Sequence, residues 1–192
     1  MAVEIDNRAT GLRRVPRGFG LVELMVVVAI VVILTMIALP SYQHFIQLNR
    51  LTTDTNNLIA AMNLARNEAA SRGRPVTVCA STDGAACDGP AADNWSGGWI
   101  VFTDYDPPGQ IDAEDALLRV FGPVATRNSL SSGGANVGYV RFGRTGAATF
   151  SSGSATDPRT FTVLTTPCES DLVRTVTITP LGRAASQPAA CP

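Results

Sequence analysis

The sequence contains no lysine, so all 15 of its basic residues are arginines. Charged residues account for only 16% of its 192 residues, which is low for a soluble protein. From residue 19 onward the chain carries 11 arginines and 14 acidic residues, so this part has a net charge of −3. A mildly acidic chain of this kind is not typical of a general nucleic-acid-binding protein. The length leaves room for a membrane segment and one modest globular domain.

Residue types that usually carry out catalysis are also scarce. The only histidine is His44, and no serine lies in a G-x-S-x-G motif, so neither an acid–base pair nor an activated nucleophile is evident. If the cysteines are oxidised, a thiol nucleophile is excluded as well. We therefore expect a protein that is not an enzyme and that needs no cofactor or bound metal.

Four cysteines are present, and they fit an extracytoplasmic domain with two disulfides. Three pairings are available to them. We favour Cys79–Cys87, which would close a loop rich in glycine and alanine, and Cys168–Cys191, which would hold the C-terminal tail. A zinc site is the alternative, but the chain has no C-x-x-C motif and a single histidine.

The most informative segment is an apolar run of 21 residues from Phe19 to Leu39, in which Glu23 is the only charged residue. As a helix it would extend about 32 Å at ~1.5 Å per residue, enough to cross a hydrocarbon core of about 30 Å. A charged group costs roughly 2.5–3.5 kcal/mol near the middle of such a segment and less near an end. Glu23 is therefore a candidate functional residue, and its expected partner is a cation that also enters the membrane.

The residues on either side of this run indicate its orientation. The leader, residues 1–18, carries four arginines and two acidic residues, a net charge of +2. Because basic residues favour the cytoplasmic side of a membrane segment, we expect the N-terminus in the cytoplasm and the chain after Leu39 outside it. An ordinary signal peptide is the alternative, but the run ends in Leu39-Pro40-Ser41-Tyr42 without a small-residue cleavage site.

Helical periodicity continues beyond the run, with polar residues such as Asp54 and Arg66 mostly elsewhere around the helix. Apolar residues recur at three-, four- and seven-residue steps: Leu48, Leu51, Leu58, Met62, Ala65 and Ala69. Gly73 and Pro75 then predict an end to the helix. We expect one helix from about Phe19 to Arg72, with a kink or local melting at Pro40, which lacks a backbone N–H.

After Pro75 the pattern changes to short apolar runs separated by glycine, proline, asparagine and aspartate. The predicted strands are Val76–Ala80, Trp99–Thr103, Leu117–Phe121, Val137–Phe142, Ala147–Phe150, Thr160–Leu164 and Thr175–Thr179. The expected fold class is α+β: a long N-terminal helix packed on an antiparallel β-sheet head.

The residues Gly18-Phe19-Gly20-Leu21-Val22-Glu23-Leu24 resemble the cleavage and assembly motif of type IV pilins and type II secretion pseudopilins. The resemblance implies that a prepilin peptidase cuts after Gly18 and methylates the new amine of Phe19. It implies that Glu23 pairs with the Phe19 amine of a neighbouring subunit, and that Pro40 accompanies helix melting inside the filament. Physical chemistry agrees, because an amine and a carboxylate in lipid are each costly alone and tolerable together.

A second block, Trp95-Ser96-Gly97-Gly98-Trp99-Ile100-Val101-Phe102-Thr103-Asp104, resembles the head of the FimT/FimU minor pilins and of type II secretion pseudopilin H. These groups share one head domain, so the resemblance does not separate a pilus from a secretion system. We expect Trp95 and Trp99 to be core aromatics rather than ligand contacts.

The acidic stretch from Asp104 to Asp115 matches several ligand places of a calcium-binding loop of the EF-hand kind. Pro108 occupies one ligand place, however, and the preceding residues read as a strand rather than a helix. We therefore interpret the stretch as a solvated hairpin loop.

The tail contains Gly182-Arg183, which resembles the start of a Gly-Arg-x-Arg element in DNA-binding FimT proteins. Ala185 stands where the second arginine would be, and one arginine neutralises neighbouring phosphates less well than two. Arg183, helped by Arg174, is the candidate for weak DNA binding, and Arg141 and Arg144 are further basic residues whose positions the sequence does not give.

Together these features predict a leader (1–18) that is removed, a transmembrane half-helix (19–39), an amphipathic half-helix (40–73) and a β-rich head (74–192). We expect a single-pass inner-membrane protein with a periplasmic head, later built into a filament. The expected function is that of a minor pilin, a structural or priming subunit of a type IV pilus. The alternatives are pseudopilin H of a type II secretion system and a DNA-binding minor pilin for natural transformation. The expected partners are a prepilin peptidase, other pilins or pseudopilins, the inner membrane and, weakly, DNA.

Overall fold

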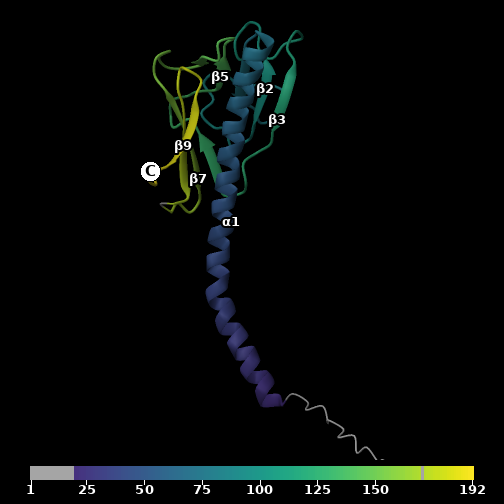
Figure 1. Cartoon of the computed structure of the whole chain (residues 1–192), viewed down its shortest axis with the longest axis vertical. Coiled ribbons are helices and arrows are strands. Elements are labelled where there is room, and N and C mark those ends of the chain that lie inside the picture. Colours follow the sequence, from purple (N-terminus) through teal and green to yellow (C-terminus); the bar gives the residue numbers. More distant parts are fainter. Residues whose placement is uncertain (1–19, 170) are drawn as a thin grey trace, which may run out of the picture. The chain divides into compact units, whose positions relative to one another are not determined.

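The computed structural model describes residues 20–169 and 171–192, without the side chains of residues 37–41. The chain divides into two compact units, Met1–Tyr42 and Gln43–Pro192. One helix, α1 (Leu21–Arg72), contributes residues to both units, and every strand belongs to the second (Figure 1).

The described part of the first unit is helical, and its side chains from Leu21 to Met36 are exposed. Phe19, where the sequence places the start of the helix, lies outside the described residues. The helix is continuous through Pro40, so this structure has no melted turn there, and the role of Pro40 in assembly stays a prediction. Across the residues that the structure describes, no helix is long and apolar enough to cross a membrane.

The second unit contains two antiparallel sheets in its described residues. One sheet has the strand order β3-β2-β1-β5-β6 and the other has the order β4-β7-β8-β9. The strands are β1 (Val76–Ala80), β2 (Trp99–Thr103), β3 (Leu117–Phe121), β4 (Asn128–Ser131), β5 (Tyr139–Phe142), β6 (Ala148–Phe150), β7 (Arg159–Thr165), β8 (Val173–Ile178) and β9 (Ala184–Pro188). The α+β class with an antiparallel head, which the sequence predicts, is confirmed.

The apolar face of α1 packs on both sheets. Leu51, Leu58 and Met62 are at most 1% exposed and share one core with residues of β1, β2, β4, β5, β7 and β8. The small side chains of Ala65 and Ala69, both fully buried, bring the last turns of the helix close to the sheets. The helical periodicity read from the sequence therefore identifies the face that is buried.

The central strands β1 and β2 are buried on both faces. Val78 and Val101 face the core shared with α1, whereas Cys79, Ile100 and Phe102 form a second apolar cluster on the opposite face. Because successive side chains of a strand point to opposite faces, five buried residues in a row require cover on both sides. The second cover comes from Cys87, Ile111 and Tyr139, which lie in or beside the connecting loops.

The two tryptophans are core residues, as the sequence predicts. The Trp95 side chain is fully buried, donates its Nε1–H to the Val137 carbonyl oxygen at 2.8 Å and meets the Phe161 ring edge-on at 5.0 Å between centroids. Trp99 is 1% exposed and stacks on Phe121 at 5.5 Å. Neither ring is available as a surface contact for a ligand.

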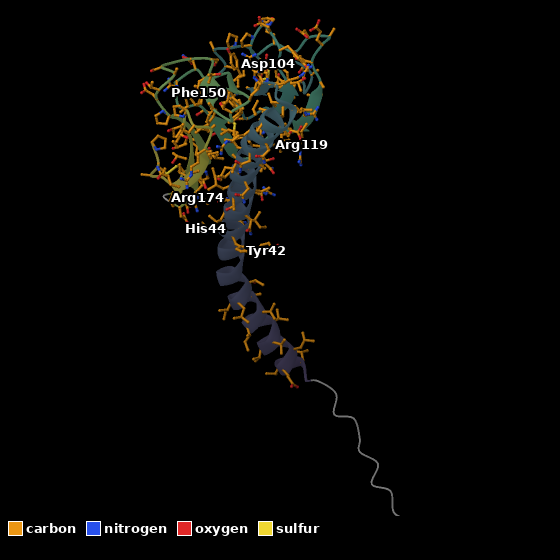
Figure 2. All side chains as sticks on the ribbon, turned by 45° about the horizontal axis from the view of Figure 1, so that its top comes forward. Tyr42, His44, Asp104, Arg119, Phe150 and Arg174 are labelled. Atoms are coloured by element: carbon orange, nitrogen blue, oxygen red, sulfur yellow. A yellow bond between two sulfur atoms is a disulfide. The ribbon has the colours of Figure 1, made fainter. Side chains whose placement is uncertain are left out.

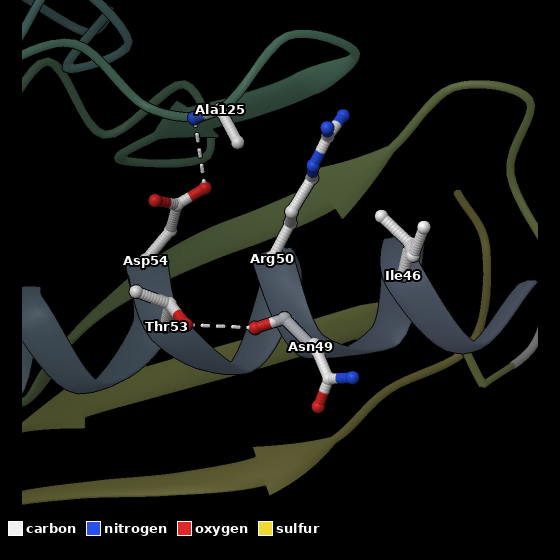
Figure 3. A pocket seen from close by; sticks show the side chains of 6 residues that line it. All are labelled: Ile46, Asn49, Arg50, Thr53, Asp54 and Ala125. Atoms are coloured by element: carbon white, nitrogen blue, oxygen red, sulfur yellow. Dashed lines mark hydrogen bonds between the residues drawn. The ribbon is translucent and has the colours of Figure 1, made fainter. Parts of the chain in front are cut away.

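A buried polar connection ties α1 to the second sheet, and the helical pattern did not predict it. Asp54 is 7% exposed, and its Oδ2 accepts hydrogen bonds from the Ala125 amide at 3.0 Å and from Asn128 Nδ2 at 2.6 Å. Asn128 in turn accepts from the Thr165 hydroxyl at 2.7 Å. Asp54 and Ala125 also line an open hollow of about 230 Å³ beside α1 (Figure 3). A carboxylate that charge patterning assigned to the polar side of the helix is thus part of the fold.

Candidate functional site

The residues expected to act in cleavage and assembly belong to the first unit. Gly18 and Phe19 lie outside the described residues. Glu23 is in the first turn of α1 and is exposed, surrounded in sequence by exposed apolar side chains. An acidic residue in the first turn of a helix also interacts favourably with the positive end of the helix dipole. The described structure thus leaves the Glu23 carboxylate accessible, and its pairing with Phe19 stays a prediction.

Both disulfides have the pairing that the sequence analysis favours. Cys79 and Cys87 are bonded with 5.6 Å between their Cα atoms, and Cys168 and Cys191 with 6.0 Å. The first disulfide closes a loop in which Asp83 Oδ1 accepts hydrogen bonds from the Ala85 and Ala86 amides. These amide donors lower the pKa of the Asp83 carboxyl below its ordinary value, the Ala86 amide contributing most. The second disulfide joins the β7–β8 turn to the C-terminal tail.

The acidic stretch 104–115 forms the connection between the antiparallel strands β2 and β3 and is mostly exposed, as predicted, but the interpretation is wrong for Asp104. Asp104 is 1% exposed, and its Oδ2 accepts hydrogen bonds from the Thr77 hydroxyl and from the Gly109 amide, the latter at 2.9 Å. The Arg141 Nε lies 3.5 Å from the same oxygen. Asp104 therefore binds protein groups in place of a cation.

Arg141 and Asp115 hold the rest of this stretch in place. Arg141 Nη2 donates to the carbonyl oxygens of Asp104 and Tyr105, both at 2.9 Å, so this arginine is not available for a surface patch. Asp115 accepts from the Tyr105 amide at 3.1 Å and from the Asp112 amide at 3.2 Å. Partial burial raises the pKa of the Asp115 carboxyl above its ordinary value.

Of the two arginines expected to bind DNA, Arg174 lies near the start of β8 and Arg183 lies in the turn that follows the other end of β8. Arg183 is exposed, and its carbonyl oxygen accepts a hydrogen bond from the Thr179 amide. Thr179 directly follows β8 and is five residues from Arg174. At ~3.4 Å per residue this separation is roughly 17 Å. Figure 2 places Arg174 at the same end of the second unit as His44, whereas Asp104 lies toward the other end. Arg174 donates to the Asp171 and Val173 carbonyl oxygens, so it supports a turn.

Arg144 and Arg66, not Arg174, are the basic residues that lie near Arg183, since Arg66 Nε is only 3.3 Å from the position that a Cβ atom on Gly182 would take. Arg144 and Arg183 are exposed residues of two turns, 143–147 and 179–183, that are joined by a hydrogen bond from the Ala148 amide to the Pro180 carbonyl oxygen at 2.8 Å. The turns approach so closely that a Cβ atom on Gly182 would lie 1.9 Å from the Gly146 carbonyl oxygen. Gly182, with φ of 76°, is therefore required for this approach.

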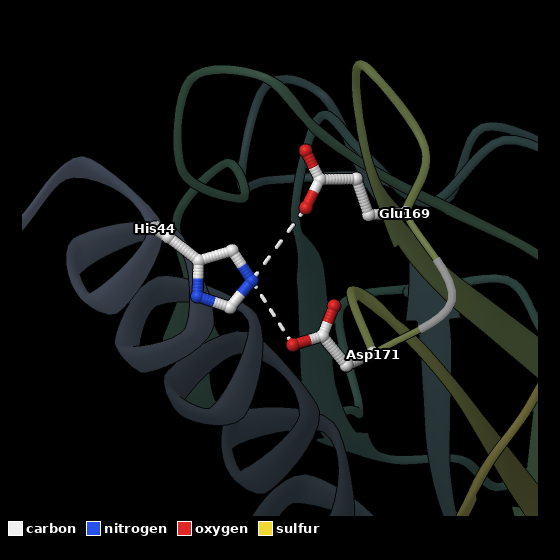
Figure 4. Close-up of side chains that lie close together, drawn as sticks. All are labelled: His44, Glu169 and Asp171. Carbon is white, nitrogen blue, oxygen red and sulfur yellow. Dashed lines mark ion pairs between the residues drawn. The ribbon is translucent and has the colours of Figure 1, made fainter. Parts of the chain in front are cut away.

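The sequence analysis did not predict one cluster of side chains that lie close enough together to hold a metal ion. His44 Nε2 on α1 lies 3.0 Å from Asp171 Oδ2 and 3.6 Å from Glu169 Oε2 in the β7–β8 turn (Figure 4). Histidine and the two carboxylates are separated by more than 120 residues, so no local motif connects them. The one available signal was that His44 is the only histidine in the chain.

Comparisons with known proteins agree with this architecture. The family model described as type II transport protein GspH matches residues 54–182, and the model of the prokaryotic N-terminal methylation motif matches residues 13–39. The chain is 27% identical over 136 residues to the type IV major fimbrial protein FimA of Dichelobacter nodosus, an alignment that covers 63% of this chain and 76% of that protein.

Solved structures of similar fold include the type IV minor pilin FimU of Pseudomonas aeruginosa. The TM-score is 0.56 at 23% identity, over 73% of this chain and 90% of that chain. The minor pseudopilin EpsH of the type 2 secretion system of Vibrio cholerae overlaps with a TM-score of 0.48 at 13% identity, over 72% and 97% of the two chains. The fold of the FimU structure and the span of the GspH match confirm the resemblance found in the sequence. The chain belongs to the GspH family and carries a prokaryotic N-terminal methylation motif ahead of its GspH domain.

Proposed function

We propose that this protein is a minor pilin, a structural and priming subunit of a type IV pilus. The observation that carries the proposal is the joining, in one chain, of an N-terminal methylation motif at residues 13–39 to a GspH domain at residues 54–182. The FimU-like fold and the similarity to a fimbrial protein support it. The chemistry is assembly rather than catalysis.

The same proposal gives the order of the steps by which the protein is processed and assembled. The chain is inserted in the inner membrane with its head in the periplasm, a prepilin peptidase cuts it after Gly18 and methylates Phe19, and other pilins then take it up into a filament. The amphipathic half of α1 is held to the head by a buried apolar core and by the hydrogen bonds of Asp54, which is what a subunit needs if force on its helix is to reach its head. Pseudopilin H of a type II secretion system is the alternative, and the description of the matching family supports it.

The proposal is tested by following an epitope-tagged full-length chain in its own cells. We expect a shortened, methylated form in the inner membrane and in the sheared filament fraction, and only the uncut form in a strain that lacks the prepilin peptidase. Deleting the gene is expected to reduce piliation if the protein belongs to a pilus, and to block protein secretion if it belongs to a secretion system. A chain that stays uncut in cells with active peptidase would rule out both functions.

DNA binding is a second candidate function, supported by the neighbouring positions of Arg144 and Arg183. This chain lacks the second arginine of the Gly-Arg-x-Arg element, because Ala185 stands in its place. Arg144, exposed on the turn next to that of Arg183, offers a second phosphate contact instead. Few phosphate contacts imply weak, sequence-independent binding that falls steeply with salt.

This candidate is tested by titrating the full chain in detergent with duplex DNA at low and at physiological salt. We expect micromolar binding at low salt that Arg183→Gln and Arg144→Gln each weaken, lowering the salt slope by about 1. Arg174→Gln is the matched control, because it removes the same charge from the other end of β8. Absence of binding at low salt would leave a purely structural subunit.

A further inference from the structure

The side chains of His44, Glu169 and Asp171 form a cluster that the assembly function does not use. His44 is 38% exposed, and the two carboxylates are 57% and 53% exposed, so solvent ions reach all three. One ligand atom from each residue lies within 4.8 Å of the other two. In the part of the chain that the structure describes, it is the one group of three or more such residues that is close enough to hold a metal ion.

The geometry fits a small tetrahedral cation as well as it fits an ion pair. Zinc binds imidazole nitrogen and carboxylate oxygen at about 2.0–2.2 Å, so two ligands of a tetrahedral site lie about 3.3 Å apart. The Nε2-to-oxygen distances of 3.0 and 3.6 Å bracket this value. The Nε2 atom of His44 can donate a hydrogen bond to only one of the two carboxylates at a time, so an ion pair uses the second carboxylate less fully. A divalent cation would neutralise both.

The backbone of the two acidic residues is anchored to the head on both sides of the cluster. Glu169 follows Cys168, which is bonded to Cys191, and the Leu172 amide donates to the Glu169 carbonyl oxygen at 2.9 Å. Leu172 is fully buried, and Arg174 donates to the Asp171 carbonyl oxygen at 3.2 Å. The disulfide, the buried Leu172 and these hydrogen bonds lie beside both proposed ligands and lower the entropy that their backbone would lose on binding an ion.

We propose that His44, Glu169 and Asp171 bind one zinc ion, with water as the remaining ligand. One imidazole with two carboxylates suits zinc, whereas calcium and magnesium prefer six or more oxygen ligands. The ion would fix α1 at His44 to the β7–β8 turn beside the Cys168–Cys191 disulfide. Its role is structural: it joins the first helical turn of the second unit, at His44, to the β7–β8 turn of the sheet that carries the C-terminal tail.

The test is a calorimetric titration of the metal-stripped full chain, purified in detergent through a tag without histidine, with zinc chloride. We expect one zinc ion per chain with micromolar or tighter affinity, and a rise in the unfolding temperature with zinc. His44→Gln and Asp171→Asn should each weaken the affinity at least tenfold and abolish the rise. Asp157→Asn, an exposed carboxylate elsewhere on the second unit, is the matched control and should behave as the unaltered chain does.

Two further measurements of the unfolding temperature serve as controls. The unfolding temperature of each variant without metal should stay close to that of the unaltered chain, which separates loss of the site from loss of the fold. Calcium chloride should give no comparable rise, which separates a zinc site from general screening of the carboxylates. Zinc affinity that His44→Gln leaves unchanged, or binding of much less than one ion per chain, would mean that the cluster is only a surface ion pair and would overturn the proposal.

Discussion

Replacing Glu23 with alanine is expected to leave membrane insertion and peptidase cleavage largely intact and to remove most of the protein from assembled filaments. In the proposed filament, the Glu23 carboxylate pairs with the methylated amine of Phe19 on a neighbouring subunit. Without its partner, that amine stays charged in an apolar environment, where an unpaired charge costs roughly 2.5–3.5 kcal/mol on insertion scales. At 1.4 kcal/mol per tenfold change, this corresponds to roughly a hundredfold loss in the equilibrium for incorporation.

The measurement is the ratio of tagged protein in sheared filaments to that in the membrane fraction. Glu23→Gln is the matched variant, because it keeps the size and polarity of the side chain, including one acceptor oxygen, while removing its charge, and it should also impair incorporation. Replacement of Gly18 by a bulky residue is the control for an earlier block: it should leave the chain uncut. Ordinary amounts of the Glu23→Ala protein in sheared filaments would refute the pairing role.

Most of the fold could be predicted from the sequence, because the buried elements have strong apolar patterns. The three strands Val76–Ala80, Trp99–Thr103 and Leu117–Phe121 have the bounds that their apolar runs predict. The strands β4 and β9 were missed. Both are edge strands of the second sheet, where one side has no neighbour and few side chains need burial. β4 has a single fully buried side chain, Leu130, and β9 has none, so neither has a detectable period.

The candidate site was less predictable, because its residues depend on contacts between distant segments. The N-terminal motif is local, and the sequence alone was sufficient to find it. By contrast, the position of Arg183 relative to Arg144 depends on the close contact of two turns. The position of His44 relative to Asp171 depends on the packing of α1 against the β7–β8 turn. Charge patterning also misplaced Asp54 and Asp104, since a buried carboxylate and an exposed one look alike in sequence.

Asp104 is the most deeply buried acidic residue among the described residues, and its replacement should cost much stability. Its side chain is completely buried, and it accepts hydrogen bonds from the Thr77 hydroxyl and the Gly109 amide beside the Arg141 guanidinium. Asp104→Ala leaves both donors without an acceptor and leaves the guanidinium without its nearest carboxylate. Breaking a buried pair from one side costs about 3–5 kcal/mol, and because Arg141 is 22% exposed we expect about 3 kcal/mol.

Urea unfolding of the full chain in detergent, followed by tryptophan fluorescence, measures this loss because Trp95 and Trp99 are in the core. Glu114→Ala is the matched control: it removes one negative charge from the same acidic stretch at an exposed position and should change the free energy of unfolding by less than about 0.5 kcal/mol. The Asp104→Ala/Arg141→Ala double variant should lose less than the sum of the two single losses, because the second change removes a charge that the first left unpaired. If the two losses simply add, Asp104 stabilises the head only through its hydrogen bonds from Thr77 and Gly109. Arg141 then contributes only through its own hydrogen bonds to the carbonyl oxygens of Asp104 and Tyr105.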